Sequence, residues 1–479
     1  MPECAAVGPR VKPEDSSAEL LAIYGASSEV ICTMTEIKVT RLPRDPGPAA
    51  WNCILPHAPD PTPLEDNITA DWLVIGGGFT GLAAARRLSQ LCAGDKIVLL
   101  DACRIAEGPA GRNSGFMIDL PHDLASEDYG GALDADRTQI RLNRTAITFA
   151  AEAAEEYAMN PEAFQKVGKI NAAASEKGLR HTRDYAGHLA KLGEEHRFLD
   201  ATEMRALSGS SYSQGGLFTP GTAMLQPALF VRALAEGMSP VVAVHENSPV
   251  TALARDGSSW RATTPSGAVS AKRVILAVNG HVESFGFFPR RLMHIFLYGS
   301  MTRPLSGDEI TTLGGEANWG FTPADPMGTT LRKISGTSGT RIIVRNRVTF
   351  DPELEIPDAR IARMGQTHDK CFEARFPMLP DVSMEYRWGG RLCLSRNNVT
   401  AFGELEQGLY SACCQNGLGA ARGTLSGMLA GELAAGRPSE FTDLLLGEDE
   451  PTKLPPEPFA SLGAAAVMRW GEYKAGAEL

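Results

Sequence analysis

The chain has 479 residues, a length that predicts two domains because a single hydrophobic core does not grow to this size. It is 43% hydrophobic and 22% charged, as ordinary globular proteins are, so no large part of it is expected to be disordered. The formal net charge of −11 argues against nucleic acid or an anionic membrane as a partner, and no apolar run approaches the ~20 residues that a transmembrane segment needs.

The first 50 residues are expected to form a poorly ordered extension. Residues 1–33 show no clear periodicity and no signal-peptide pattern, and the sequence from Met34 onward is more typical of the start of a protein. The segment from Pro43 to Pro63 is rich in proline and is predicted to run extended over the surface. Trp51 is expected to anchor this segment to the rest of the protein.

A strand–turn–helix–strand pattern follows between Asp71 and Asp101. Four apolar residues, Trp72 to Ile75, lead into a glycine cluster, a helical pattern runs from Thr80 to about Leu91, and a second apolar run ends at Asp101. This is the context in which a G-x-G-x-x-G sequence indicates dinucleotide binding.

Each glycine of this motif has a physical role. Gly76 permits the tight turn, Gly78 lets the backbone approach a pyrophosphate, and Gly81 lets helix and strand pack closely. The helix N-terminus directs free N–H groups at phosphates. Asp101 comes at the end of the second strand, where a carboxylate can accept hydrogen bonds from an adenosine ribose.

The loop GPAGRNSGF follows the second strand. Its small residues would let a flat aromatic ligand lie against the backbone, and Arg112 could offset phosphate charge. The alternative is a plain glycine-rich turn. His122 comes next, between Pro and Asp, and two roles stay open for it: a turn or surface histidine, or a catalytic one.

The middle of the chain predicts alternating helices and strands. Helices are expected over Asp134–Met159, Ser175–Leu192 and Pro227–Ala235, and a strand over Lys166–Ala174. The run from Ala271 to Gly280 is apolar and ends in Asn-Gly, which predicts a strand of a buried parallel sheet. Whether Asn279 and Gly280 also approach a ligand stays open.

From Arg290 to about Arg387 the pattern changes to alternating runs separated by Gly, Ser and Pro. This predicts an antiparallel sheet in a second domain inserted into the first. Four arginines of this region could line an anionic pocket, and alternation puts three of them on one face, where a solvated surface is the alternative. They are Arg332, Arg341, Arg345 and Arg347, the last three sharing the face.

A second glycine-rich strand-to-helix turn lies at Asn416–Gly419. The strand that enters it follows Gly408, and the helix that leaves it runs to Gly436. A helix N-terminus directed into the same cleft as the first motif could lie under a ring system that accumulates negative charge.

Together these segments resemble a known family. GGGFTGLAAA with Asp101, the GRNSGF loop, the VILAVNG strand and the NGLGAARG helix entry are similar to the FAD-dependent D-amino-acid oxidase, glycine oxidase and sarcosine oxidase superfamily, and look closest to its gamma-glutamylputrescine-oxidase-like branch. The resemblance spans roughly Trp51 to Gly436. It implies an α/β fold with an FAD-binding, Rossmann-like domain of the glutathione-reductase type and an inserted α+β substrate domain built on an antiparallel sheet.

On this resemblance the FAD-binding domain is expected at residues 51–125, 165–290 and 388–440. A helical segment at 126–164 and the substrate domain at 291–387 complete the body, and 441–479 form a C-terminal tail. The predicted FAD-binding residues are Gly76, Gly78, Phe79, Thr80, Gly81, Asp101, Arg112, Asn113, Ser114, Gly115, Val250, Asn279, Gly280, Asn416, Gly417, Leu418 and Gly419. The ribose acid of the family is usually Glu, and here it is Asp101.

The nine cysteines are odd in number, scattered and without a CxxC pair, so no zinc site or disulfide framework is predicted and the cytoplasm is the expected location. Some sarcosine oxidases attach flavin through a cysteine. Cys393 lies in broadly the right region, but its surroundings do not match, so the FAD is expected to be non-covalent.

The implied reaction removes hydride from the α-carbon of a neutral amine to flavin N5 and leaves an imine that hydrolyses. The apolar slot for the C–H bond is sought at Phe116, Met117, His122 and Tyr298, of which His122 and Tyr298 are the catalytic candidates. The substrate is an amine or an amino acid: an arginine would grip a carboxylate, whereas polyamines would favour acidic walls. Oxygen or an electron carrier would reoxidise the flavin. Two alternatives are a nicotinamide-dependent dehydrogenase and a flavin-binding, non-catalytic subunit.

Overall fold

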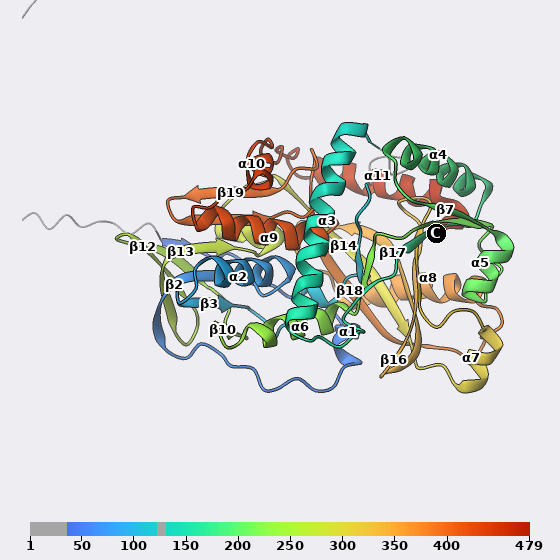
Figure 1. Cartoon of the computed structure of the whole chain (residues 1–479), viewed down its shortest axis with the longest axis horizontal. Coiled ribbons are helices and arrows are strands. Elements are labelled where there is room, and N and C mark those ends of the chain that lie inside the picture. Colours follow the sequence, from blue (N-terminus) through green and yellow to red (C-terminus); the bar gives the residue numbers. More distant parts are fainter. Residues whose placement is uncertain (1–35, 122–130) are drawn as a thin grey trace, which may run out of the picture. The chain divides into compact units, whose positions relative to one another are not determined.

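Two large sheets organise the chain (Figure 1). The computed structural model describes residues 36–121 and 131–479, and Thr35–Leu479 form one compact unit. Nine strands make the first sheet and eight make the second. Within the described residues, no helix has the length and apolarity that crossing a bilayer requires.

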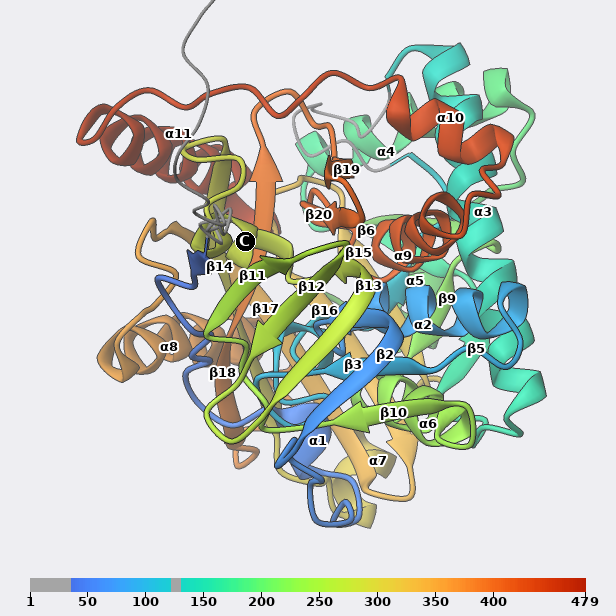
Figure 2. The same cartoon turned by 90° about the vertical axis from the view of Figure 1, so that its left-hand side faces the viewer.

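Parallel strands form the centre of the first sheet, shown face-on in Figure 2. Strand β2 pairs in parallel with β3 on one side and with β13 on the other, and β13 also pairs in parallel with β20. Because both faces of these strands are covered at their carboxyl ends, the sequence there is a continuous apolar run, as in Trp72–Ile75 of β2 and Val274–Leu276 of β13. The predicted parallel strand before Asn279 is therefore confirmed. The bounds are β2 Asn67–Ile75, β3 Ile97–Leu100, β10 Val242–His245, β13 Ala268–Leu276 and β20 Leu409–Cys413.

Antiparallel strands extend this sheet at its far side and include the N-terminal segment. Strand β1 pairs with β11, with Ile37 opposite Leu253, so residues 36–38 belong to the sheet rather than to a poorly ordered extension. A strand this short is unable to show a period, and its partner comes from a distant part of the chain. The bounds are β1 Glu36–Lys38, β11 Ala252–Asp256, β12 Ser259–Thr263 and β19 Ala401–Glu406.

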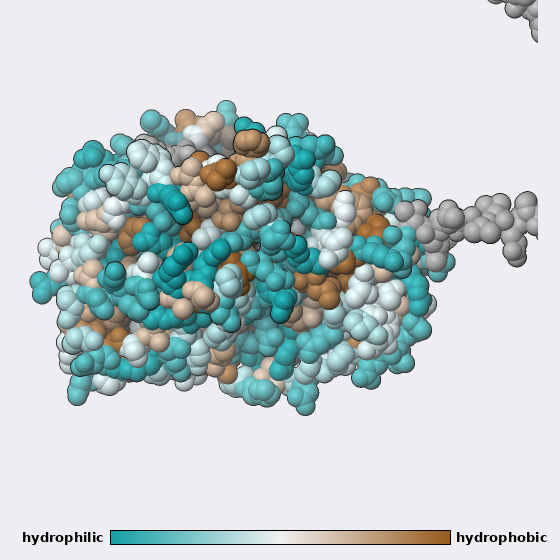
Figure 3. Space-filling view, turned by 180° about the vertical axis from the view of Figure 1, so that it is seen from behind, coloured by the Kyte–Doolittle hydropathy of each residue, from teal (hydrophilic) through white to brown (hydrophobic). Residues whose placement is uncertain are grey.

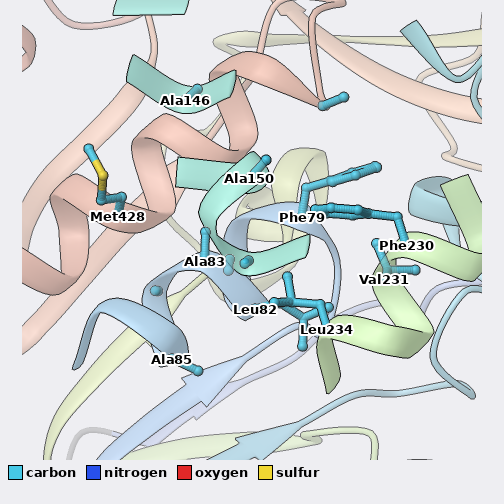
Figure 4. Packing of buried hydrophobic residues seen from close by; sticks show 14 of the residues in the cluster. Phe79, Leu82, Ala83, Ala85, Ala146, Ala150, Phe230, Val231, Leu234 and Met428 are labelled. Atoms are coloured by element: carbon cyan, nitrogen blue, oxygen red, sulfur yellow. The ribbon is translucent and has the colours of Figure 1, made fainter. Parts of the chain in front are cut away.

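Four helices cover one face of the parallel strands and bury a common core (Figure 4). The rings of Phe79 and Phe230 stack with their centroids 6.0 Å apart. Three glycines spaced four residues apart on α9, Gly423, Gly427 and Gly431, face α2 and let the two helices approach closely. The bounds are α2 Phe79–Leu91, α3 Leu133–Glu156, α6 Pro227–Met238 and α9 Ala421–Ala434.

The second sheet is antiparallel, as predicted, except where β15 pairs in parallel with β6. Its strand order is β18-β14-β17-β16-β15-β6-β8-β7. Stacked rings of Trp319 and Phe321, with Phe376 beside them, fill its core. The bounds are β6 Lys169–Ala173, β7 Arg197–Asp200, β8 Gly215–Thr219, β14 Leu292–Thr302, β15 Trp319–Pro323, β16 Thr330–Gly336, β17 Gly339–Phe350 and β18 Met384–Ser395.

The strands of the two sheets alternate along the chain, whereas the sequence predicted that the second domain is a single segment inserted into the first. Residues 169–219 supply β6, β7 and β8 to the second sheet, although 165–290 was expected in the first domain, and β18 crosses the expected boundary at residue 388. The expected helical segment contains α3, which packs on α9 and α6. The pairing of β6 with β15 joins segments that are far apart in the chain, and no local pattern signals it.

The expected C-terminal tail is also part of the body. Helix α10, Glu440–Leu446, packs on α9, and helix α11, Phe459–Ala475, packs on β17. The remaining elements are α1 Ala50–Cys53, β4 Phe116–Met117, β5 Phe164–Lys166, α4 Glu176–Leu192, α5 Ala201–Ser208, β9 Ala223–Leu225, α7 Gly307–Leu313, α8 Asp358–Arg375 and the short 3-10 turns Pro109–Gly111, Asn279–Phe285 and Gly476–Glu478.

The close contact of α2 with α9 predicts a stability difference between two helix-interior glycines. A Cβ at Gly427 would lie 1.9 Å from the carbonyl oxygen of Thr80, so Gly427→Ala should lower the free energy of unfolding by about 2 kcal/mol or more. A Cβ at Gly187, in α4, meets nothing within 4 Å, so Gly187→Ala should raise it by up to about 1 kcal/mol. The denaturant midpoints of the two variants measure these changes in stability. Equal changes in the two variants would contradict the prediction.

Candidate active site

A cavity of about 500 Å³ gathers the sequence motifs from distant parts of the chain. This volume lies in the range of sites for small molecules and cofactors. The first glycine-rich turn, the GRNS loop, the end of β13 and the second glycine-rich turn all line it, and so does the second sheet. Of the predicted FAD-binding residues, the cavity is lined by Gly76, Gly78, Phe79, Thr80, Asp101, Arg112, Asn113, Ser114, Val250, Asn279, Gly280, Gly417, Leu418 and Gly419.

The first glycine-rich turn has the geometry that its sequence predicts. Gly76 has a φ of +107°, and a Cβ there would lie 2.6 Å from the carbonyl oxygen of Ala277, the residue directly after β13. A Cβ at Gly81 would lie 1.7 Å from the carbonyl oxygen of Gly76, so this glycine serves helix–strand packing and does not line the cavity. Gly78 is the extended N-cap of α2, which leaves the helix N-terminus open toward the cavity.

Asp101 is held in place by two backbone donors at the end of β3. Its Oδ2 accepts a hydrogen bond from the Gly77 amide at 2.6 Å, and its Oδ1 accepts one from the Cys103 amide at 2.8 Å. Burial raises the pKa of Asp101 to about 6, against the opposing effect of these two bonds. The carboxylate is thus fixed in the cavity wall next to the turn that would hold a pyrophosphate.

Arg112 has a different role from the one expected. Its guanidinium donates to the carbonyl oxygens of Glu107 at 2.7 Å, Pro46 at 2.9 Å and Gly47 at 2.9 Å, with a longer bond to Gly389. These bonds use its donors inside the protein, so the group ties the N-terminal segment to the loop rather than offsetting phosphate charge. The loop is further fixed by Trp51, whose Nε1 donates to the Asn113 carbonyl at 2.8 Å, which confirms Trp51 as an anchor.

Arg332 is a buried cation directly beneath the GRNS loop, a position that no sequence pattern indicated. Its Nη1 donates to the carbonyl oxygens of Gly115 at 3.1 Å, Leu225 at 2.6 Å and Ser114 at 3.2 Å. Its guanidinium carbon lies 5.2 Å from the ring centroid of Trp51. Burial lowers the pKa of Arg332 to about 9. Arg332 was expected to be able to line an anionic pocket, but it lies behind the GRNS loop and is not among the residues that line the cavity; Gly115, which contacts it, does not line the cavity either.

Arg345 and Arg347 line the cavity, whereas Arg341 does not. The β14–β17 register shifts at Arg347, which has a φ of +61°, and such a bulge re-aims side chains away from simple alternation. Arg347 Nη1 donates to Glu472 Oε2 of α11 at 2.7 Å. Arg341 is buried and donates to the Thr302 carbonyl at 2.8 Å. The expected common face of these three arginines is therefore wrong.

The end of β13 and the second glycine-rich turn form the facing wall. Asn279 and Gly280 lie in this wall, and the buried Oδ1 of Asn279 has no hydrogen-bond partner within the protein, as expected of an atom that meets a ligand. Gly419 and Ala420, at the start of α9, also line the cavity. Asn416 does not: its Nδ2 donates to the Val399 carbonyl at 2.8 Å and its Oδ1 accepts from the Ser395 amide at 2.8 Å.

A charged cluster in the cavity wall escaped the sequence interpretation. Arg391 forms a bidentate pair with Asp45, at 3.0 Å from Nε and 2.9 Å from Nη2, and its Nη1 lies against His281 Nε2. Burial, together with the charge of Arg391, lowers the pKa of His281 to about 2, so this histidine is neutral. Arg391 lies in β18, but its partner Asp45 comes from the N-terminal segment, which carries no chemical pattern of its own.

The four residues predicted for the apolar slot that holds the substrate C–H bond lie in different parts of the protein. Phe116 and Tyr298 line the cavity, Met117 lies fully in the core, and His122 lies outside the described residues. Thr349 donates to Asp351 at 2.5 Å, so the Tyr298 hydroxyl, 2.7 Å from Thr349 Oγ1, is the donor to Thr349. Burial also raises the pKa of Tyr298. These features favour Tyr298 as a wall residue over a proton acceptor.

Cys393 lines the cavity, but its environment does not favour a covalent link. Burial raises the pKa of this thiol well above its ordinary value, and the neighbouring Cys414 adds to the effect. The thiolate is the nucleophilic form of cysteine, so a neutral thiol is poorly disposed to attack a flavin. This agrees with the expectation of non-covalent FAD.

The turn, the fixed carboxylate and the two facing helix N-termini define a dinucleotide-binding flavoprotein, and sequence comparison supplies the family. A family model described as FAD dependent oxidoreductase matches residues 71–433, so the chain belongs to that family and its cofactor is FAD. The orphaned Asn279 Oδ1 and the open approach at Gly78 fit this cofactor.

Individual relatives agree with this assignment. The chain is 26% identical to a probable oxidoreductase OrdL of Rhizobium meliloti over 84% of this chain and 91% of the relative. It is 26% identical to gamma-glutamylputrescine oxidoreductase of Escherichia coli over 80% of this chain and 88% of the relative. Glycine oxidase from Geobacillus kaustophilus superposes with a TM-score of 0.65 over 81% of this chain and all of that chain, at 15% identity, which shows the fold alone.

The environment of Asp101 predicts a pH dependence of FAD binding. Protonation below pH about 6 removes a charged acceptor, so the FAD dissociation constant should rise as the pH falls from 7.5 to 5. Asp101→Asn should weaken FAD binding at pH 7.5 at least about tenfold, because a charged acceptor is lost and the new NH2 group faces the N–H donors of Gly77 and Cys103. The variant should also show a flatter dependence of FAD affinity on pH. Fluorescence titration measures this. Asp71→Asn, at an exposed pair with Lys272, is the control, and an unchanged profile in Asp101→Asn would contradict the role.

Proposed function

We propose that this FAD-dependent oxidoreductase oxidises a C–N bond of a small amine that also carries a carboxylate, such as an amino acid. The observation that carries the proposal is the cavity that joins the dinucleotide motifs to Arg345 and Arg347 on the second sheet. The names of one sequence relative, gamma-glutamylputrescine oxidoreductase, and one structural neighbour, glycine oxidase, refer to compounds that carry both an amine and a carboxylate.

The charge of the lining supports a carboxylate over a polyamine. Two acids line the described part of the cavity: Asp45 is paired with Arg391, and Asp101 lies at the dinucleotide end. Neither is placed to receive a second ammonium group at the substrate end. The cationic lining residues are more numerous, although three of them pair with acids of the protein: Arg41 with Glu353, Arg347 with Glu472 and Arg391 with Asp45. The other three are Arg104, Arg112 and Arg345.

FAD held at the turn of Gly76 and Gly78 and beside Asp101 would supply the hydride acceptor. The α-carbon of the neutral amine would lose a hydride, which leaves a protonated imine that water hydrolyses. Arg345 orients the carboxylate of the substrate. Phe116 and Tyr298 supply apolar walls that exclude water, and the hydrogen bond of Tyr298 to Thr349 fixes its ring. The N-terminus of α9 at Gly419 and Ala420 presents the positive end of the helix to the cavity, which stabilises negative charge there.

The electron acceptor and location complete the proposal. Either oxygen or an electron carrier reoxidises the flavin. The rate at which the flavin absorption returns in air distinguishes the two, since a fast return indicates oxygen as the acceptor. The seven described cysteines are free thiols, which fits a reducing compartment, so we propose the cytoplasm.

Anaerobic titration of the holoprotein tests the reaction. The flavin band near ~450 nm should bleach with amino acids, N-alkyl glycines or gamma-glutamylputrescine, and should persist with putrescine or spermidine, which lack a carboxylate. Bleaching by polyamines alone would contradict the substrate class. A flavin that no amine reduces would favour a non-catalytic subunit, and bleaching only by reduced nicotinamide would favour a nicotinamide-dependent enzyme.

Arg345→Met tests the carboxylate contact. The variant loses a charge-assisted hydrogen bond that is equally strong in the substrate complex and in the transition state. KM for the carboxylate-bearing substrate should therefore rise at least about tenfold, while kcat changes little. The flavin spectrum should stay the same. Arg303→Met, at an ion pair with Glu309 away from the cavity, is the matched control. A fall in kcat with constant KM would contradict the role.

A further inference from the structure

Helix α11 carries an unusual concentration of exposed apolar side chains. Eleven large hydrophobic residues are exposed in the described part of the chain, and five of them lie on this one helix. On the face shown in Figure 3 the surface is mostly hydrophilic with scattered apolar positions. The five residues are Phe459, Leu462, Val467, Trp470 and Tyr473, with exposed fractions of 62 to 78%.

Four of these residues, together with Ala466, form a stripe along one side of the helix. Phe459, Leu462, Ala466, Trp470 and Tyr473 follow one another at spacings of three and four, which is the period of a single helix face. The rings of Trp470 and Tyr473 stack, with centroids 5.7 Å apart. We call these five residues the α11 stripe. An apolar stripe of this kind marks an interaction surface.

The opposite side of α11 is already used inside the protein. Met468 lines the cavity, Glu472 pairs with Arg347 at 2.7 Å, and a Cβ at Gly471 would lie 2.9 Å from Met327. The helix is thus anchored by its inner side and presents the α11 stripe outward. In Figure 2 it lies at the periphery, where nothing in the described structure covers it.

We propose that a second copy of this chain covers the α11 stripe through antiparallel pairing of the two helices. The stripe is symmetric about Ala466: Leu462 and Trp470 lie four residues to either side, and Phe459 and Tyr473 lie seven to either side. In an antiparallel pair crossing at Ala466, Leu462 therefore faces Trp470 and Phe459 faces Tyr473 of the other copy. A small residue at the crossing lets the helices approach closely.

The charges at the two ends of the helix complement this arrangement. Glu457 precedes α11, Lys474 lies in its last turn, and both are exposed. In an antiparallel pair, the acidic N-terminal end of each helix lies beside the basic C-terminal end of the other. This arrangement places Glu457, two residues before α11 begins, at the same end of the pair as Lys474 of the other copy. An anionic lipid surface is disfavoured because the chain carries a net charge of −11.

Cross-linking of the FAD-loaded protein tests the symmetry. In a background with Cys4, Cys32 and Cys53 replaced by Ser, Ala466→Cys should form an intermolecular disulfide under mild oxidation, because residue 466 meets itself at the crossing. Ala465→Cys, exposed but turned about 100° around the helix, should not. Equal cross-linking at the two positions, or none at 466, would overturn the proposal.

Light scattering of the same holoprotein tests the interface. The wild type should have twice the chain mass of 51.2 kDa, and Trp470→Glu should halve this value with an unchanged flavin spectrum. Val241→Glu, at an exposed apolar residue elsewhere, should stay dimeric. Glu457→Lys and Lys474→Glu should each weaken the dimer by about threefold to tenfold, and the double variant should restore it.

Three results would overturn the proposal. One is a wild type that stays at the mass of one chain at ~100 µM, and another is a Trp470→Glu variant that remains a dimer. The third is a wild-type single chain that floats with vesicles of phosphatidylcholine and phosphatidylglycerol while Trp470→Glu does not, since that would identify a lipid surface as the occupant. None of these results depends on the proposed reaction.

Discussion

The site depends on the parallel pairing of β13 with β2 on one side and β20 on the other. These three strands come from widely separated segments of the chain, and parallel pairing aligns their carboxyl ends at one edge of the sheet. Each strand ends in a turn that needs unusual backbone: Gly76 after β2, Asn279 after β13 and Asn416 after β20 all have positive φ. The cavity exists because these three turns share that edge.

Close helix packing holds this edge in shape. Gly81 brings α2 onto the turn at Gly76, and Gly427 brings α9 onto α2, in both cases at distances that a methyl group would prevent. The two helix N-termini therefore face one cavity from fixed directions. Since partial charges at helix ends act only over short distances, this fixed approach is what makes them useful to an anionic ligand.

Two buried arginines connect this edge to the rest of the protein. Arg112 joins the N-terminal segment, the GRNS loop and β18, while Arg332 holds the same loop from the second sheet. Every hydrogen bond described for them is donated to a backbone carbonyl, so each stabilises a chain path rather than a partner charge. A buried cation without a carboxylate partner stays favourable to negative charge nearby, and Arg332 lies beside Phe116 of the cavity wall.

The sequence by itself determined the glycine-rich turn after β2, the position of an acid, Asp101, directly after β3, the parallel strand before Asn279 and the antiparallel character of the second sheet. These features depend on requirements that neighbouring residues meet together: glycine where φ is positive or backbones touch, and apolar runs where both faces are covered. Only the tertiary structure decided the pairing of Asp45 with Arg391, the burial of Arg332, the bulge at Arg347 and the place of α11 beside the cavity. Each of these joins segments that are far apart in the chain, and a charged side chain has the same local sequence signature whether it meets water, a carbonyl or a carboxylate.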